Sequence, residues 1–183
     1  MKELLDDVRQ AVRWVLAPGK SVGARVFLLH LAAAAALGGF WYHGALTAVL
    51  AGGGTFVWAI LVVAAAAAGY GTWAAYRFDT ARRTLLRRIK VTKGRTAVSW
   101  LEWADSAVLL LGFLGTLQGA IIELAAFDTT ATGDTLVSAM GGVLHGLGIA
   151  IYSTVAGAAA SFWLSLGTRT VSNAVEAEAE KLP

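Results

Sequence analysis

The 183-residue chain has no cysteine, only three histidines and few charged residues. The absence of cysteine excludes disulfides and thiolate metal sites. The histidines do not have the spacing of metal ligands, and the sequence contains no Ser/His/Asp order, no phosphate-binding loop and no paired carboxylates in the middle of its apolar runs. We therefore expect neither an enzyme nor a cofactor or metal site.

The scarcity of charge is matched by an excess of apolar residues. Charged residues make up 15% of the chain and hydrophobic residues 57%, whereas soluble domains have about 25% and about 45–50%. This composition predicts an integral membrane protein. The net charge of +3 would also suit a nucleic-acid-binding protein, but the positions of the charges argue against that function.

Four apolar runs are long enough to cross a bilayer, for which about 20 residues suffice. We expect an all-α protein with four transmembrane helices. The first two spans, near 25–42 and 55–76, consist mainly of Ala, Leu and Val without a polar stripe and are expected to form an outer, lipid-facing layer. The last two lie in 105–168, on either side of the polar sequence DTTATGD. The expected domains are a surface helix in 1–24, an outer hairpin in 25–76, a basic connection in 77–104, a second hairpin in 105–168 and a tail in 169–183.

The two ends of the chain are polar and are not expected to span. Residues 2–16 have the pattern of an amphipathic helix, ended by Pro18 and Gly19, that either lies along the membrane surface or contacts another protein. The tail contains Glu176, Glu178 and Glu180. Its acids either keep the end soluble or pair with the basic segment of a neighbouring subunit.

The basic residues indicate the topology. Eight of the 15 Lys and Arg residues lie in 77–104, while the connections 43–54 and 125–137 have none. The positive-inside rule then places both termini in the cytoplasm. We expect the basic segment to form a short helix that extends the second span and contacts anionic lipids, and we expect no nucleic acid. Trp73, Tyr76, Trp100 and Trp103 mark the inner interface.

A stripe of small and polar residues follows the third span. On a helical wheel of roughly 100° per residue, Gly112, Thr116, Gly119 and Glu123 fall within about 40° of Asp105. Polar positions in a membrane span usually face the bundle interior or a wet cavity. Small residues let another helix approach closely. We therefore expect this stripe to face a partner helix.

The fourth span has a similar stripe around Thr154. Ala150, Ala158 and Ser161 lie within about 40° of Thr154, and Gly146 and Gly157 flank them. His145 lies roughly opposite Thr154 on the same wheel and should point away from the stripe. The other intramembrane histidine, His30 in the first span, either relays protons or simply packs.

Two segments resemble the pore-lining helices of the MotA/TolQ/ExbB family. The first is LLGFLGTLQGAI, in which Gly112 to Gly119 match the family pattern G-[IL]-[IL]-G-T-x-x-G except at Phe113. The second is GIAIYSTVAGA, in which Ala150 to Ala158 loosely match A-L-[IL]-T-T-x-x-G-A. The chain is most similar to the MotA branch. It lacks the large cytoplasmic insertion between the second and third spans with which flagellar members of the family grip the rotor, so we do not expect contact with a flagellar rotor.

The resemblance implies a subunit of an ion-driven motor in the bacterial inner membrane. Such subunits form a ring, expected here to be a pentamer, around a dimer of a MotB/ExbD/TolR-like single-span protein that supplies the ion-binding aspartate. The transported ion would be a proton or sodium. Thr116 and Thr154 would offer hydroxyls to it, and Asp105 and Glu123 would either mark the ends of its path or be ordinary solvated acids. The pore-lining residues expected on this basis are Asp105, Gly112, Thr116, Gly119, Glu123, Ala150, Thr154, Ala158 and Ser161.

A different class of function stays open on the same residues. The chain would then be a self-sufficient channel or a membrane scaffold, with its stripes packed against copies of itself and no central partner. The sequence does not distinguish the biological output of a motor, nor proton from sodium.

Overall fold

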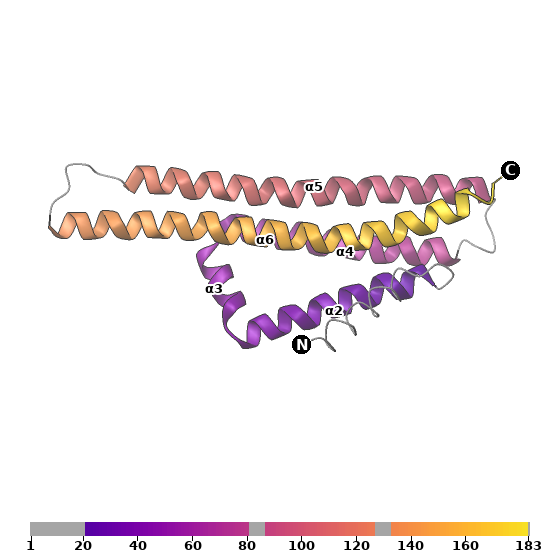
Figure 1. Ribbon diagram of the computed structural model, residues 1–183, viewed down its shortest axis with the longest axis horizontal. Coiled ribbons are helices and arrows are strands. Elements are labelled where there is room, and N and C mark those ends of the chain that lie inside the picture. The colour runs from indigo at the N-terminus through magenta and orange to yellow at the C-terminus, as the bar shows by residue number, and fades with distance from the viewer. Residues whose placement is uncertain (1–20, 81–86, 127–132, 183) are drawn as a thin grey trace, which may run out of the picture. The chain divides into compact units, whose positions relative to one another are not determined.

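The computed structural model describes residues 21–80, 87–126 and 133–182. These residues form five helices and no strands: α2 (Val22–Tyr42), α3 (Ala45–Gly52), α4 (Gly54–Thr80), α5 (Arg87–Ala126) and α6 (Asp134–Ala179) (Figure 1). The all-α prediction is confirmed. The amphipathic helix expected at 2–16 lies outside the described residues.

Four of these helices are long and apolar enough to cross a membrane: Val22–Tyr42, Gly54–Thr80, Arg87–Ala125 and Ala139–Ala179. The four expected membrane spans are therefore confirmed as candidates by length and composition. At 1.5 Å per residue, the 40 residues of α5 extend about 60 Å, twice the hydrocarbon thickness of about 30 Å. Both α5 and the 46-residue α6 must therefore continue beyond the bilayer.

The basic segment differs from the prediction. We expected its helix to extend the second span; α4 includes only the first residues of the segment, Arg77 to Thr80, and the residues from Arg87 on belong to α5. This part of α5 packs against α4, because a Cβ on Gly71 would lie 3.4 Å from the Leu101 side chain. Residues 87–104 are thus the first turns of the third long helix.

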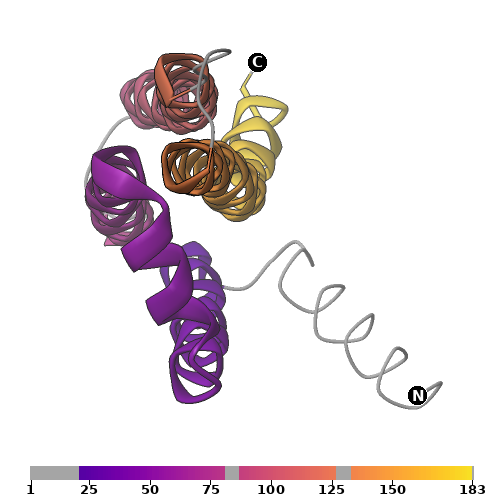
Figure 2. The same cartoon turned by 90° about the vertical axis from the view of Figure 1, so that its left-hand side faces the viewer.

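The helix α3 is also absent from the predictions. It occupies the connection between the first two spans, and Gly44 (φ +73°) and Gly54 (φ +62°) flank it in left-handed conformations that favour glycine. Helix-forming Ala and Leu residues lie between these glycines. In the end-on view of α5 and α6, the axis of α3 runs at an angle to theirs (Figure 2).

The chain divides into two compact units, residues 1–35, 66–103 and 163–183 in unit 1 and residues 36–65 and 104–162 in unit 2. Parts of α2, α4, α5 and α6 form the apolar core of unit 1. A Cβ on Gly94 of α5 would lie 2.5 Å from Val175 of α6 and 3.2 Å from Phe78 of α4, so glycine permits close packing of three helices. The buried residues of this core are Val22, Val26, Ala75, Phe78, Val91, Leu101, Val171 and Val175.

A carboxylate of α4 caps the start of α2 in unit 1. Asp79 accepts hydrogen bonds from the Val22 and Gly23 N–H groups (3.2 and 2.7 Å) and from the Ser21 hydroxyl (2.8 Å). The first N–H groups of a helix have no intrahelical partners and carry partial positive charge. Asp79 therefore stabilises the beginning of α2 and joins it to α4.

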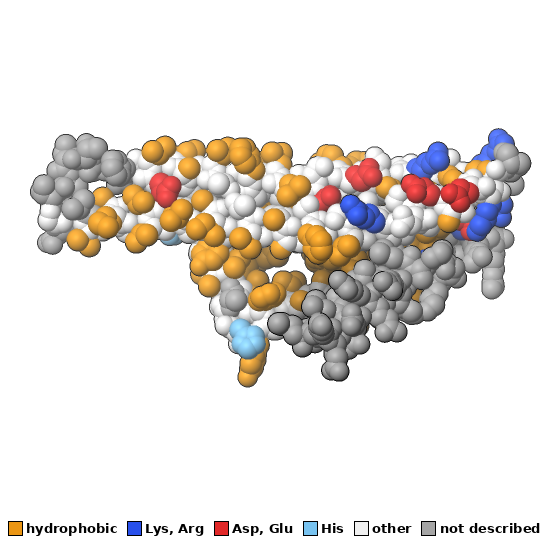
Figure 3. All heavy atoms as spheres, viewed as in Figure 1, with side chains coloured by type: hydrophobic (Ala, Val, Ile, Leu, Met, Phe, Trp, Pro, Cys, Tyr) orange, Lys and Arg blue, Asp and Glu red, His pale blue; other side chains and the backbone are white. Residues whose placement is uncertain are grey.

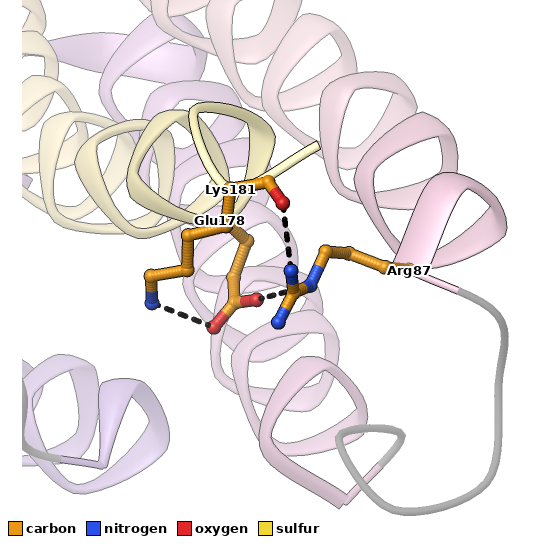
Figure 4. A network of polar contacts seen from close by, with 3 residues as sticks. All are labelled: Arg87, Glu178 and Lys181. Carbon is orange, nitrogen blue, oxygen red and sulfur yellow. Dashed lines mark hydrogen bonds and ion pairs between the residues drawn. The ribbon is translucent and has the colours of Figure 1, made fainter. Parts of the chain in front are cut away.

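An ion-paired cluster joins the start of α5 to the end of α6 in unit 1 (Figure 4). Arg87 Nε lies 3.5 Å from a Glu178 carboxylate oxygen, and an Arg87 terminal nitrogen donates to the Lys181 carbonyl (2.7 Å). Lys181 Nζ lies 3.4 Å from the other Glu178 oxygen. Glu178 therefore pairs with the basic segment of its own chain.

Candidate functional site

Small residues bring α5 and α6 together in unit 2. A Cβ on Gly112 would lie 3.1 Å from the Ser153 carbonyl oxygen, and one on Gly119 would lie 2.7 Å from the Ala150 nitrogen. A Cβ on Gly157 would lie 2.9 Å from the Gly112 Cα. The neighbouring atoms are backbone, which cannot rotate away as a side chain can. We call this close contact, between residues 105–123 of α5 and 146–161 of α6, the α5–α6 seam.

The hydroxyls of Thr116 and Thr154 meet at the middle of the seam. Their Oγ1 atoms are 2.5 Å apart. Thr116 also lies within hydrogen-bond distance of the Gly112 carbonyl (3.0 Å), and Thr154 of the Ala150 carbonyl (2.8 Å). Thr116 is half-buried and Thr154 is exposed at the side of the seam. The pair is therefore held by both helices and is accessible to a group outside the chain.

Each hydroxyl has one hydrogen and two lone pairs. At this separation one hydroxyl donates to the other, since two oxygens without a hydrogen between them would repel. The hydroxyl that accepts can point its own hydrogen either to a carbonyl of its helix or to a group outside the chain. The pair can therefore offer a lone pair to a donor or cation, or a hydrogen to an acceptor, without moving the backbone.

An acid lies at each end of the seam. Near one end, the Ser161 hydroxyl donates to the Asp105 carboxylate, and Ser161 is buried. Near the other, a Cβ on Gly146 would lie 3.0 Å from Glu123 Cγ, so the Glu123 side chain passes over Gly146. Both acids are partly buried. The seam thus carries a carboxylate, a hydroxyl pair and a second carboxylate along its length.

The two stripes predicted from the sequence face each other. Asp105, Gly112, Thr116, Gly119 and Glu123 all have neighbours on α6 in the seam. The matching α6 residues are Gly146, Ala150, Thr154, Gly157 and Ser161. Ala158 is exposed.

Gly115 and Ser153 also belong to the seam, although neither was predicted as a site residue. A Cβ on Gly115 would lie only 2.6 Å from the Ser153 hydroxyl oxygen, and Ser153 is fully buried and donates to the Ile149 carbonyl (2.7 Å). The spacing of Gly112, Gly115 and Gly119 at three and four residues was the available signal. It indicates a wider contact face than the two stripes alone.

Many large apolar side chains of α5 and α6 in unit 2 are exposed. Hydrophobic residues are prominent on the visible face of α5 and α6 in unit 2 (Figure 3). The exposed ones are Leu109, Leu110, Phe113, Leu114, Leu117, Ile121 and Leu124 on α5, and Val137, Met140, Leu144, Leu147, Ile151, Val155 and Phe162 on α6. In a membrane protein these side chains meet lipid or other subunits.

Two of the histidines lie within long helices, His30 in α2 and His145 in α6. His30 belongs to unit 1, where its ring packs edge-to-face on Trp163 with centroids 5.2 Å apart. His145 is exposed on α6. Within the described ranges, no group of His, Asp and Glu residues is arranged to hold a metal ion.

No family model, no curated protein and no solved structure matches this chain. The four long apolar helices define it as a multi-pass membrane protein. The MotA/TolQ/ExbB resemblance therefore depends on the motif residues of the seam.

Proposed function

We propose that the chain is the ring-forming subunit of an ion-driven membrane motor. The observation that carries this proposal is the contact of Thr116 with Thr154 at the middle of two apolar helices, with Asp105 and Glu123 toward the ends of the same seam. Polar groups inside membrane spans are costly and usually serve an ion or substrate path. The motif resemblance assigns the same two threonines to a pore.

The seam lacks a carboxylate at the level of the threonines, so the ion-binding acid comes from a partner. In this mechanism a MotB/ExbD/TolR-like single-span dimer presents an aspartate to the exposed side of Thr154. A carboxyl group in an apolar surrounding favours its neutral form. Hydroxyl lone pairs accept from the protonated acid, and hydroxyl hydrogens donate to the ionised one. Ionisation is thus favoured only where the aspartate meets the hydroxyl pair, which couples ion transfer to the partner's position.

The assembly we propose is a pentamer in the bacterial inner membrane, with both termini cytoplasmic. Subunit contacts would cover part of the exposed apolar surface on α5 and α6. The transported ion is a proton in this proposal, with sodium as the other ion that a hydroxyl site serves. Asp105 and Glu123 then lie where the ion leaves and enters the seam.

A second function, a self-sufficient channel or scaffold, is favoured by one observation. The glycines of both stripes pack against each other within the chain. They therefore need no partner helix to account for them. In this case the exposed side of Thr154 would face another copy of the chain or a water-filled path.

The test replaces each hydroxyl by a methyl group. Thr116→Val and Thr154→Val keep the shape of the side chain, and Thr72→Val is the matched control because Thr72 donates only to the Ala68 carbonyl of its own helix (2.9 Å). Proteoliposomes with an imposed proton or sodium gradient are assayed with and without any co-purifying single-span protein. We expect flux only with that protein, and a fall of about tenfold in either seam variant, as loss of roughly 1.4 kcal/mol of transition-state stabilisation gives.

The outcomes separate the candidates. Flux without a partner that the seam variants reduce would establish the channel instead. Absence of both flux and partner would leave the scaffold. A cryo-EM structure with Thr154 in contact with lipid, rather than with a central helix, would refute the motor.

A further inference from the structure

Unit 1 contains a cavity of about 520 Å³ between α4 and α5, with Val171 of α6 at its floor. This volume lies within the roughly 300–1,000 Å³ typical of small-molecule sites. Phe78, Ala97 and Val171 are buried in its wall, and Gly94 lets the helices approach closely there. The inner wall of the cavity is therefore apolar and closely packed.

Three cations line the cavity: Arg77 on α4, and Lys90 and Lys93 on α5. No Asp or Glu is among the described residues that line it. Arg77 and Lys93 are exposed at its rim, whereas Lys90 is buried. Lys90 also acts electrostatically on Glu178. The rim cations are thus the ones best placed to meet an anion.

Aromatic rings hold two of the cations in position. The Arg77 guanidinium lies 4.9 Å from the Trp73 ring centroid, and Lys90 Nζ lies 4.1 Å from that of Phe78. Both side chains are therefore oriented before an anion binds. The hydroxyls of Thr80 and Thr96 at the wall donate to backbone carbonyls of their own helices. Charge, rather than neutral hydrogen bonding, would select the ligand.

The cavity lies where aromatic side chains gather at the end of apolar runs. Trp73 and Tyr76 are exposed near the end of α4, and Trp100 and Trp103 are exposed on α5. Exposed Trp and Tyr residues of membrane proteins concentrate at the level of the lipid headgroups. A phosphate at the cationic rim would then lie at headgroup depth, with apolar surface beside Trp73 and Tyr70 for an acyl chain.

We infer that this cavity binds an anionic glycerophospholipid, with its phosphodiester between Arg77 and Lys93 and the start of an acyl chain along Trp73. Diffuse attraction of basic residues to a membrane requires no cavity. A site predicts that the binding depends on which basic residues are present, not on how many. This inference does not depend on the proposed motor function, and either can fail alone.

The first experiment compares two pairs of charge removals. Arg77→Gln with Lys93→Gln removes both rim cations, and Arg88→Gln with Arg95→Gln removes two exposed cations of α5 that do not line the cavity. Native mass spectrometry of the purified chain measures binding of phosphatidylglycerol and phosphatidylcholine. We expect a preference for phosphatidylglycerol that falls about tenfold in the first pair, at roughly a few-fold per lost cation, and less than about twofold in the second. An equal fall in both pairs would overturn the site.

A second experiment fills the cavity without changing charge. Thr96→Trp places a bulky ring in the open cavity, and Thr92→Trp is its control because Thr92 is exposed one turn earlier, makes the same backbone hydrogen bond and does not line the cavity. Only Thr96→Trp should reduce phosphatidylglycerol binding. Equal effects would contradict the inference.

Glycerol 3-phosphate separates a lipid from a free phosphate. We expect it to displace phosphatidylglycerol only at concentrations far above that of the lipid. Displacement at equal concentration would assign the cavity to a soluble phosphate and overturn the lipid. Thermal unfolding of each variant distinguishes lost binding from lost folding.

Discussion

Gly119 has no room for a methyl group. A Cβ there would lie 2.7 Å from the Ala150 nitrogen and 2.8 Å from the Ala150 Cβ. Gly119→Ala should therefore separate α5 from α6 locally and lower the free energy of unfolding by about 1–3 kcal/mol, as overpacking typically does. Unfolding in mild detergent, followed by circular dichroism against added denaturant, measures the change.

Gly141→Ala is the matched control for this prediction. Gly141 belongs to α6 in the same unit, and a Cβ on it would meet no atom within 4 Å. The substitution should be neutral or stabilise by about 0.5–1 kcal/mol, since alanine favours the helix. Equal effects of the two substitutions would mean that α5 and α6 do not pack closely at Gly119.

Helical periodicity predicted the seam residues for a simple geometric reason. Positions three and four apart share a face of a helix, so Gly112, Thr116 and Gly119 had to lie together. Periodicity does not identify what that face contacts. The sequence therefore did not distinguish a partner helix from α6 of the same chain, and it did not indicate that Thr116 and Thr154 touch.

At the scale of helices, the end of α6 depends on one carboxylate. Burial raises the pKa of Glu178, but the charges of Lys90, Lys181 and Arg87 outweigh it and lower the pKa below its usual value of 4.5. An acid whose pKa is lower in the folded state than in the unfolded state stabilises the fold at pH values above its unfolded pKa. This stabilisation is lost as the pH falls through the pKa of the folded state. We expect the last turn of α6 to loosen from the start of α5 below about pH 4.5, while the apolar core keeps the preceding turns in place.

The absence of cysteine makes this prediction measurable. Spin labels on Arg88→Cys and Glu180→Cys, both exposed sites, report the distance between the two helix ends. The distribution should broaden on acidification, and Glu178→Gln should broaden it already at pH 7. Glu176→Gln is the control because Glu176 is exposed and accepts only from Ser172 (3.4 Å). A distribution that does not depend on pH would contradict the role of Glu178.

Hydropathy predicted the four candidate membrane spans but not where their helices end. The spans near 25–42 and 55–76 coincide closely with α2 and α4, because apolar runs of this length leave few alternatives. Residues 87–104 were assigned to a connection because their charge excludes them from lipid. Charged side chains are nevertheless compatible with a helix. The contacts of Leu101 with Gly71 and of Val175 with Gly94 stabilise these residues as part of α5.

For the whole molecule, burial within one chain accounts for little of the apolar surface. Between 17% and 39% of the most apolar window of each candidate span is buried. The remaining side chains require lipid or other subunits, since patches of this size are not stable in water. Composition alone thus predicted that the chain lies in a membrane. It does not predict which lipids or subunits cover the exposed apolar surface, because a single sequence does not show which surface of another molecule fits it.

The final prediction concerns the orientation of the chain in the membrane. Lys and Arg residues are concentrated in 77–104 and absent from 43–54, so α3 should lie outside the cell and the end of α6 inside. In intact cells a membrane-impermeant maleimide should label Thr47→Cys. It should label Glu180→Cys only after permeabilisation, and Ala65→Cys, near the middle of α4, under neither condition. The chain has no native cysteine, so each signal reports one site. Labelling of Glu180→Cys in intact cells would reverse the topology and place Glu123 rather than Asp105 at the cytoplasmic end of the seam.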